Sequence, residues 1–197
     1  MHGDVKIPIY KYGKQTDTID LEFLQERMKK GEFKSPLRDK SFLVLLYWTG
    51  VRKSEAYERV KEDFDVNKTK TDLVIDFHQR KKNGLKVPPL EIPLDLPYVN
   101  LIREQLERTR TGERVWFLSS ATAWRIVKRA LGKKYYPHFL RLNRITRMFD
   151  DPTTTIPEAK SWTGIKTAKA LDVYIGFSKR RMEKGKERLR REVLFVS

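Results

Sequence analysis

The feature that most constrains this chain is an apolar run, FLVLLYW, at positions 42–48. The run is far shorter than the roughly 20 apolar residues that an α-helix needs to cross a bilayer. It therefore predicts a buried helix, over 37–49, that ends at Gly50. The chain has 197 residues, of which 39% are hydrophobic, and this is enough to bury a core as one domain.

Helix signals recur along much of the remaining sequence. Asp20 is a capping residue for a helix that Gly31 ends, and Ser54 is a capping residue for a helix over 55–64. Amphipathic periodicity with capping or breaking residues predicts further helices over 97–109, 121–131, 138–149 and 157–163. Another helix is expected to carry Tyr174.

The hydrophobic period changes between residues 70 and 94. Residues 71–79 and 85–94 alternate and are rich in β-formers, and KKNG lies between them, which predicts a β-hairpin. Pro93 confines the second strand to an edge of the sheet. The predicted fold class is therefore α+β, mostly α-helical with one small antiparallel β-sheet.

Charge is the most informative part of the composition. The chain has 42 Lys and Arg against 26 Asp and Glu, a net charge of +16. A folded domain this basic most often meets a polyanion, with nucleic acid as the first candidate; ribosomal association or an incidentally basic surface are the alternatives. The N-terminal sequence lacks the apolar core of a signal peptide, so a cytoplasmic protein without membrane association is the default expectation.

Several common chemistries lack their motifs here. The sequence has no cysteine and three histidines, and none of His2, His78 and His138 lies four residues from another, so no metal site is predicted. The glycine-rich nucleotide-binding motifs and the GxSxG nucleophile motif are also absent. No cofactor is expected.

Three basic motifs remain. TGVRKSE places Arg52 in a Gly-containing turn before a helix, where a guanidinium is well placed to hold an anion. KKNGLK, at 81–86, occupies the hairpin tip, and HFLR puts His138 and Arg141 on one helix face. Each motif alone also fits a plain role, such as a surface pair between Arg52 and Glu55 or a solvated hairpin tip.

The order of these motifs is more specific than any one of them. T-G-x-R-x-x-E, K-x-G-x-K, H-x-x-R and G-x₉-Y follow one another along residues 18–178. This order resembles the catalytic domain of the tyrosine recombinase (phage integrase) family, and the diverged integrases of archaeal viruses and plasmids in particular. Tyr174, which by itself would be an ordinary half-buried aromatic near Leu171, then becomes the candidate nucleophile.

The resemblance implies a catalytic set of Arg52, Lys82, His138, Arg141 and Tyr174. The two arginines would clamp the non-bridging oxygens of the scissile phosphate, and the histidine would hydrogen-bond that phosphate and handle protons. Lys82 would protonate the leaving 5′ oxygen, and the tyrosine would form a 3′-phosphotyrosyl link.

Supporting and DNA-binding roles follow from the same resemblance. Glu55 would orient Arg52. Lys81 and Lys86 are the alternatives to Lys82 as the hairpin acid. Contacts with DNA are expected from Lys81, Lys86, Arg144, Lys179, Arg180 and Arg181.

One position departs from the family pattern. The family usually has a histidine or tryptophan directly after the glycine, as a further phosphate donor, and here that position is Ile165. Trp162 and Lys166 are the nearest candidates to replace it. Loss of one donor from such a site costs about 10²–10³ in rate.

The resemblance implies a site-specific recombinase or integrase that cleaves and rejoins double-stranded DNA, as a tetramer on DNA. The alternatives are a catalytically impaired DNA-binding protein on the same fold, a type IB topoisomerase-like relaxing enzyme, and a basic RNA-binding or ribosomal protein. Residues 1–17 are expected to be an N-terminal arm, 18–178 the catalytic domain and 179–197 a basic tail. The arm is too short for the N-terminal helical domain of larger family members, so a catalytic fragment and a naturally small enzyme are both expected possibilities.

Overall fold

The computed structural model describes residues 19–67, 69–77, 89–151, 153–165, 167–169 and 171. The predicted arm at 1–17 and tail at 179–197 lie outside this described part. Within it, helices and a small sheet alternate in the order α1 (Leu21–Lys30), α2 (Pro36–Thr49), α3 (Lys53–Tyr57), the 3-10 helix η2 (Lys61–Asp63), β1 (Phe64–Val66), β2 (Asp72–Ile75), β3 (Leu90–Pro93), α4 (Val99–Glu107), α5 (Ser120–Leu131), α6 (Pro137–Asp150) and α7 (Ile156–Thr163). The predicted α+β class is confirmed.

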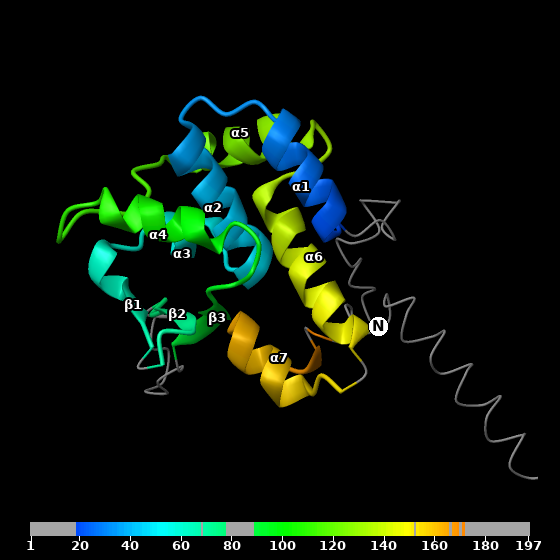
Figure 1. The fold of residues 1–197 in the computed structure, drawn as a ribbon. Coiled ribbons are helices and arrows are strands. Elements are labelled where there is room, and N and C mark those ends of the chain that lie inside the picture. Colours follow the sequence, from blue (N-terminus) through cyan, green and yellow to red (C-terminus); the bar gives the residue numbers. More distant parts are fainter. Residues whose placement is uncertain are drawn as a thin grey trace, which may run out of the picture.

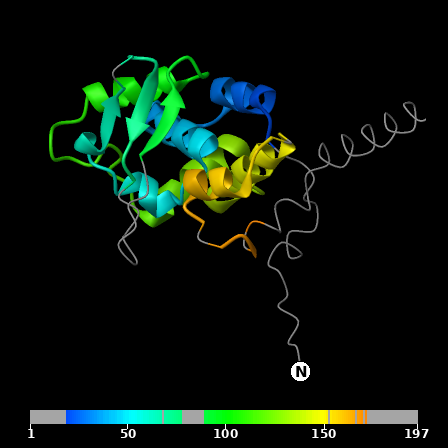
Figure 2. The same ribbon diagram turned by 90° about the horizontal axis from the view of Figure 1, so that it is seen from below.

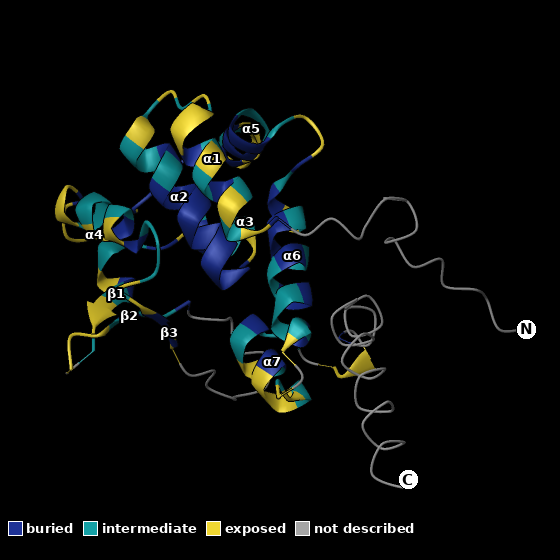
Figure 3. Cartoon of the chain, turned by 45° about the vertical axis from the view of Figure 1, so that its right-hand side comes forward, coloured by how far each residue is buried: buried dark blue, intermediate teal, exposed yellow. Residues whose placement is uncertain are grey.

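Helix α2 is the centre of the fold (Figure 1). Every residue from Ser41 to Thr49 is buried, and the helix contacts α3, α4, α5, α6 and β3. Figure 3 shows it almost wholly dark blue between partly exposed helices. A helix that is apolar on all sides needs partners on all sides, which explains the apolar run.

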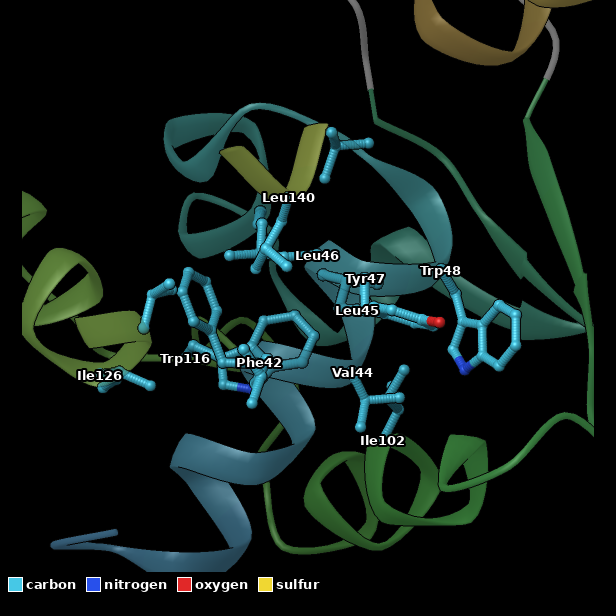
Figure 4. Close-up of a cluster of buried hydrophobic side chains, with 14 of the residues drawn as sticks. Phe42, Val44, Leu45, Leu46, Tyr47, Trp48, Ile102, Trp116, Ile126 and Leu140 are labelled. Atoms are coloured by element: carbon cyan, nitrogen blue, oxygen red, sulfur yellow. The ribbon is translucent and has the colours of Figure 1, made fainter. Parts of the chain in front are cut away.

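Aromatic rings join α2 to the sheet and to the segment before α5 (Figure 4). Trp116 packs edge-on against Phe42, with ring centroids 5.9 Å apart, and against Phe64 at 5.7 Å. Its indole Nε1 donates a hydrogen bond of 2.9 Å to Ser41 Oγ, so the buried polar atom is satisfied.

The sheet is antiparallel with strand order β1-β2-β3 (Figure 2). The predicted pairing of the two hairpin strands is confirmed, with Leu73 opposite Ile92 and Asp72 opposite Pro93. Strand β3 lies at the edge, as Pro93 requires. The hairpin tip, with Lys81, Lys82 and Lys86, lies outside the described residues.

The helix predicted over 55–64 is wrong beyond Tyr57. Helix α3 starts earlier than predicted, with Arg52 rather than Ser54 at its N-cap, and residues 64–66 form β1. Phe64 pairs with Ile75 in the sheet and packs on Trp116. The local sequence pattern that predicted a helix contains no information about these long-range contacts. Tertiary contacts override local propensity here.

The other helices of the described residues begin and end within two residues of their predicted ends, and the helix predicted to carry Tyr174 lies outside the described part. Their caps are local: Asp20 accepts from Phe23 N at 2.8 Å, and Ser119 accepts from Thr122 N at 3.1 Å. Gly50 and Gly164, in the left-handed region at φ 64° and 65°, end α2 and α7. No helix of the described residues is long and apolar enough to cross a membrane.

We expect Phe42→Ala to lower the free energy of unfolding by about 3–5 kcal/mol, because Phe42 is fully buried beside Trp116. Phe117→Ala is the matched control, because this side chain is 85% exposed, and it should change stability by about 0.5 kcal/mol or less. Urea unfolding followed by circular dichroism measures both. Equal losses in the two variants would contradict the packing described above.

Candidate active site

Arg52 stands at the start of α3, directly after the turn that Gly50 makes at the end of α2. Its backbone N–H donates to Glu55 Oε2 at 2.9 Å, and its Nη1 donates to Glu55 Oε1 at 2.7 Å. One carboxylate therefore holds both the backbone and the side chain of Arg52. The Arg52 side chain is 55% exposed, so its guanidinium is oriented by Glu55 and still accessible from solvent.

Arg141, one turn into α6, is fixed much more firmly. Its side chain is 3% exposed, and Nη1 and Nη2 donate to the carbonyl oxygens of Gly50 and Thr163, both at 2.8 Å. These oxygens lie at the C-terminal ends of α2 and α7, where helix dipoles concentrate negative charge. The contacts hold the buried guanidinium in one orientation.

His138 lies three residues before Arg141, on the same face of α6. Its pKa is lowered from the ordinary value of 6.5. The main cause is partial burial, and the positive charges of Arg141 and Arg52 add to it. The three predicted side chains from two separate motifs are therefore close enough for their charges to interact.

A pocket of about 270 Å³ opens between α3, α5 and the start of α6. Its lining residues are Val51, Arg52, Lys53, Ser54, Trp124, Tyr136, Pro137, His138 and Arg141. Three of them carry a permanent positive charge, and none is a carboxylate. Such a lining favours an anion, and the planar guanidinium groups are suited to phosphate oxygens.

The segment around Ile165 is used for packing. Trp162 donates its indole N–H to the carbonyl oxygen of Thr49 at 3.1 Å, and an indole has no second donor. Ile165 packs against an apolar cluster of Ile145, Phe149, Ala159 and Leu171. Neither side chain therefore offers a donor to a phosphate in this arrangement.

Arg144, predicted to contact DNA, lies beside this segment. Its guanidinium stacks over the Trp162 ring at 4.9 Å from the centroid. Burial lowers its pKa, and the charge of Arg147 lowers it further. Its contact with DNA stays a prediction.

Several predicted site residues lie outside the described part of the chain: Lys81, Lys82, Lys86, Lys166, Tyr174, Lys179, Arg180 and Arg181. The structure also brings in residues that the sequence did not single out. Lys53 follows Arg52 directly in the TGVRKSE motif, which was a signal for it. Trp124 occupies an outward position of α5 and is 41% exposed; an aromatic residue among exposed, basic neighbours was the signal there. Ser54 and Tyr136 had no signal beyond their closeness to the two arginine motifs.

Comparison with known proteins identifies structures that share the fold of this chain. No family model and no curated protein matches the sequence. Among solved structures, the XerH site-specific recombinase in its post-cleavage complex with palindromic difH substrate has a TM-score of 0.69 at 18% identity, over 88% of this chain and 53% of that chain. The XerA recombinase has a TM-score of 0.61 at 16% identity, over 88% of this chain and 63% of that chain.

The Tn1549 transposon integrase, in complex with circular intermediate DNA, has a TM-score of 0.54 at 15% identity, over 86% of this chain and 67% of that chain. The present chain spans about half the length of the XerH chains. These likenesses show that the chain has the fold of the tyrosine recombinase catalytic domain, as the motif order indicates.

We expect Gly50→Ala to destabilise the protein more than Gly112→Ala. Both glycines have positive φ, 64° and 79°, so both substitutions carry backbone strain of about 1–2 kcal/mol. A Cβ at Gly50 would also lie 2.8 Å from Arg144 Cβ, whereas nothing lies within 4 Å of one at Gly112. The loss in unfolding free energy should be about 1–3 kcal/mol larger for Gly50→Ala, and this excess measures how closely α6 approaches Gly50. Equal losses would mean that α6 moves away without cost.

We expect proton NMR to give His138 a pKa below 6.5 in the free protein. As the pH falls, the unfolded chain, with its ordinary pKa near 6.5, takes up the proton at a higher pH than the folded protein does. The contribution of His138 to the free energy of unfolding is therefore complete above about pH 6.5 and is lost as the pH falls below that value. His138→Gln both assigns the resonance and removes this acid sensitivity. Phosphate in the pocket should offset the two arginines and raise the pKa, and a pKa that phosphate leaves unchanged would contradict an anion beside His138.

Proposed function

We propose that this chain is the catalytic domain of a site-specific DNA recombinase or integrase that cuts and rejoins strands through a 3′-phosphotyrosyl intermediate on Tyr174. The observation that carries the proposal is the pocket in which Arg52, His138 and Arg141 meet, with no carboxylate among the described residues that line it. The three residues come from motifs about 90 positions apart. The fold of the described residues supports the same assignment.

The proposed reaction exchanges one phosphodiester for another. The phenol of Tyr174 gives its proton to His138 as its oxygen forms a bond to phosphorus, and the bond from phosphorus to the 5′ oxygen breaks. Lys82 gives the leaving oxygen its proton, with Lys81 and Lys86 as alternatives. Because the ester bond is conserved, a 5′ hydroxyl from another strand can reverse the step without an external energy source.

The two arginines would stabilise the charge that develops on the non-bridging oxygens. Donors that are already oriented cost no reorganisation when the charge appears. Arg141 meets this condition through its bonds to Gly50 and Thr163, and Arg52 through Glu55. A tyrosine of ordinary pKa, near 10, needs such cations nearby to attack at neutral pH.

Double-stranded DNA is the proposed partner. The net charge of +16 favours binding to a polyanion. The structures of XerH and of the Tn1549 integrase are complexes with DNA. Exchange of strands between two duplexes would require self-association into a tetramer on DNA. The affinity of the protein for DNA should fall steeply with salt concentration, because contacts with phosphates release bound counterions.

A binding protein without cleavage is the second candidate. The position after Gly164 holds Ile165, which packs in an apolar cluster, and the Trp162 donor is engaged by Thr49. Neither of these two described side chains therefore supplies the expected phosphate donor, and Lys166, the other candidate, lies outside the described residues. This observation favours reduced cleavage, and the experiment below separates the two candidates.

A nicked suicide DNA substrate tests the proposal. Wild-type protein should form a covalent protein–DNA adduct, and Tyr174→Phe should form none, because the phenolic oxygen is the nucleophile. Absence of an adduct with wild-type protein, or an adduct with Tyr174→Phe, would refute the mechanism. Strand exchange, as opposed to relaxation of supercoils alone, then separates a recombinase from a topoisomerase-like enzyme.

Arg52→Ala tests the pocket itself. The rate of adduct formation should fall about 10²–10³-fold, the usual effect of losing one charge-stabilising donor, with a much smaller loss in duplex affinity. Arg110→Ala is the matched control, because Arg110 is exposed and does not line the pocket. Equal losses of binding and cleavage in Arg52→Ala would support the binding-only candidate. Arg141→Ala is less informative, because it also leaves two carbonyl oxygens without their donor.

A further inference from the structure

We propose that Lys53 is an additional phosphate-binding residue of the pocket, which donates from Nζ to the phosphate held by Arg52 and Arg141. The inference rests on the proposed function and deepens it, because it names a donor that the motif order does not assign. The sequence predicts roles for two arginines and a histidine of this pocket, and it predicts no role for Lys53.

The position of Lys53 is set by two elements. It is the first residue of α3, next to Arg52, and its half-buried side chain lines the pocket. Its Nζ donates a hydrogen bond of 2.8 Å to Ser120 Oγ, on the first residue of α5. The ammonium group therefore lies where α3 meets the start of α5, on a side chain that lines the pocket.

The charge of Lys53 has no partner of opposite sign in the described part of the chain. Its Nζ hydrogen-bonds a neutral hydroxyl, whereas the neighbouring Arg52 forms an ion pair with Glu55. Like charges close together repel, and none of the described residues that line the pocket is a carboxylate, although Glu55, outside the lining, pairs with Arg52. A phosphate would relieve this repulsion and give the ammonium group an acceptor of opposite charge in place of a neutral hydroxyl.

On the α7 side, the described side chains at Trp162 and Ile165 supply no donor to the pocket, and Lys166, the other candidate, lies outside the described residues. Ile165 is apolar and Trp162 donates to Thr49, so neither serves a phosphate from its described position. Lys53 would supply a donor from the α3–α5 side. The pocket volume is about 270 Å³, which leaves room for a phosphate group.

The first test compares single-turnover adduct formation in wild type, Lys53→Ala, Lys53→Arg and Lys29→Ala. Lys53→Ala should lower the rate about 10²–10³-fold while affinity for intact duplex falls far less, because binding sums many phosphate contacts. Lys53→Arg should retain much of the rate, because the charge and donor remain. Lys29→Ala is the matched control, an exposed lysine on α1 that is not part of the pocket. A Lys53→Ala rate within about threefold of wild type would overturn the proposal.

Ser120→Ala separates phosphate binding from a merely structural link between α3 and α5. A phosphate donor still has its ammonium group when the hydroxyl is removed, so this variant should keep most of the cleavage rate. A loss as large as that of Lys53→Ala would show that the link itself matters and would overturn the proposal. Both variants should fold, because a single exposed hydrogen bond contributes only about 0.5–1.5 kcal/mol.

A second test does not depend on cleavage. Inorganic phosphate, compared with sodium chloride at equal ionic strength, should raise the Tm of wild type and Lys29→Ala, because a ligand of the native state stabilises it. The rise should be clearly smaller in Lys53→Ala, and an equal rise would overturn the proposal. If wild type forms no adduct while its phosphate response depends on Lys53, the proposed cleavage fails and the inference about Lys53 stands.

Discussion

The hydrogen bonds of Arg141 join three helices that come from distant parts of the chain. From α6, the guanidinium donates to the C-terminal end of α2 at Gly50 and to that of α7 at Thr163. The negative ends of two helix dipoles offset its buried positive charge. Trp162 adds a parallel link from α7 to Thr49. The placement of α7 against the centre of the fold depends on these contacts, and so does the shape of the pocket beside them.

The same contacts connect fold and chemistry. Arg141 lines the pocket with a side chain that packing has already oriented, whereas Arg52 is exposed and is held by Glu55 alone among the described carboxylates. The turn at Gly50 brings the two arginines together. On the α7 side, Ile165, the residue after Gly164, packs against an apolar cluster. Among the described residues, the donors for a phosphate thus lie on α3 and α6, and the α7 segment holds them in place.

Local chemistry made much of this predictable from the sequence. Helix caps depend on residues within about four positions of each other, so the ends of α1 at Asp20 and of α7 at Gly164 agree closely with the structure. The alternation around Pro93 likewise predicted an edge strand. For the site, the resemblance of the ordered motifs to the tyrosine recombinase family suggested Arg52 and His138 as partners, because no single motif was specific enough to do so.

The sequence by itself determined the apolar central helix, most helix ends, the hairpin pairing and the basic motifs, because each is encoded over a few neighbouring residues. Only the tertiary structure decided that residues 64–66 form a strand, since Phe64 is drawn to Trp116 and the sheet. It also decided that Lys53 meets Ser120, a contact between residues 67 positions apart, and that Trp162 donates to Thr49, 113 positions away. Such contacts depend on how completed elements pack, and no local pattern in the chain records that packing.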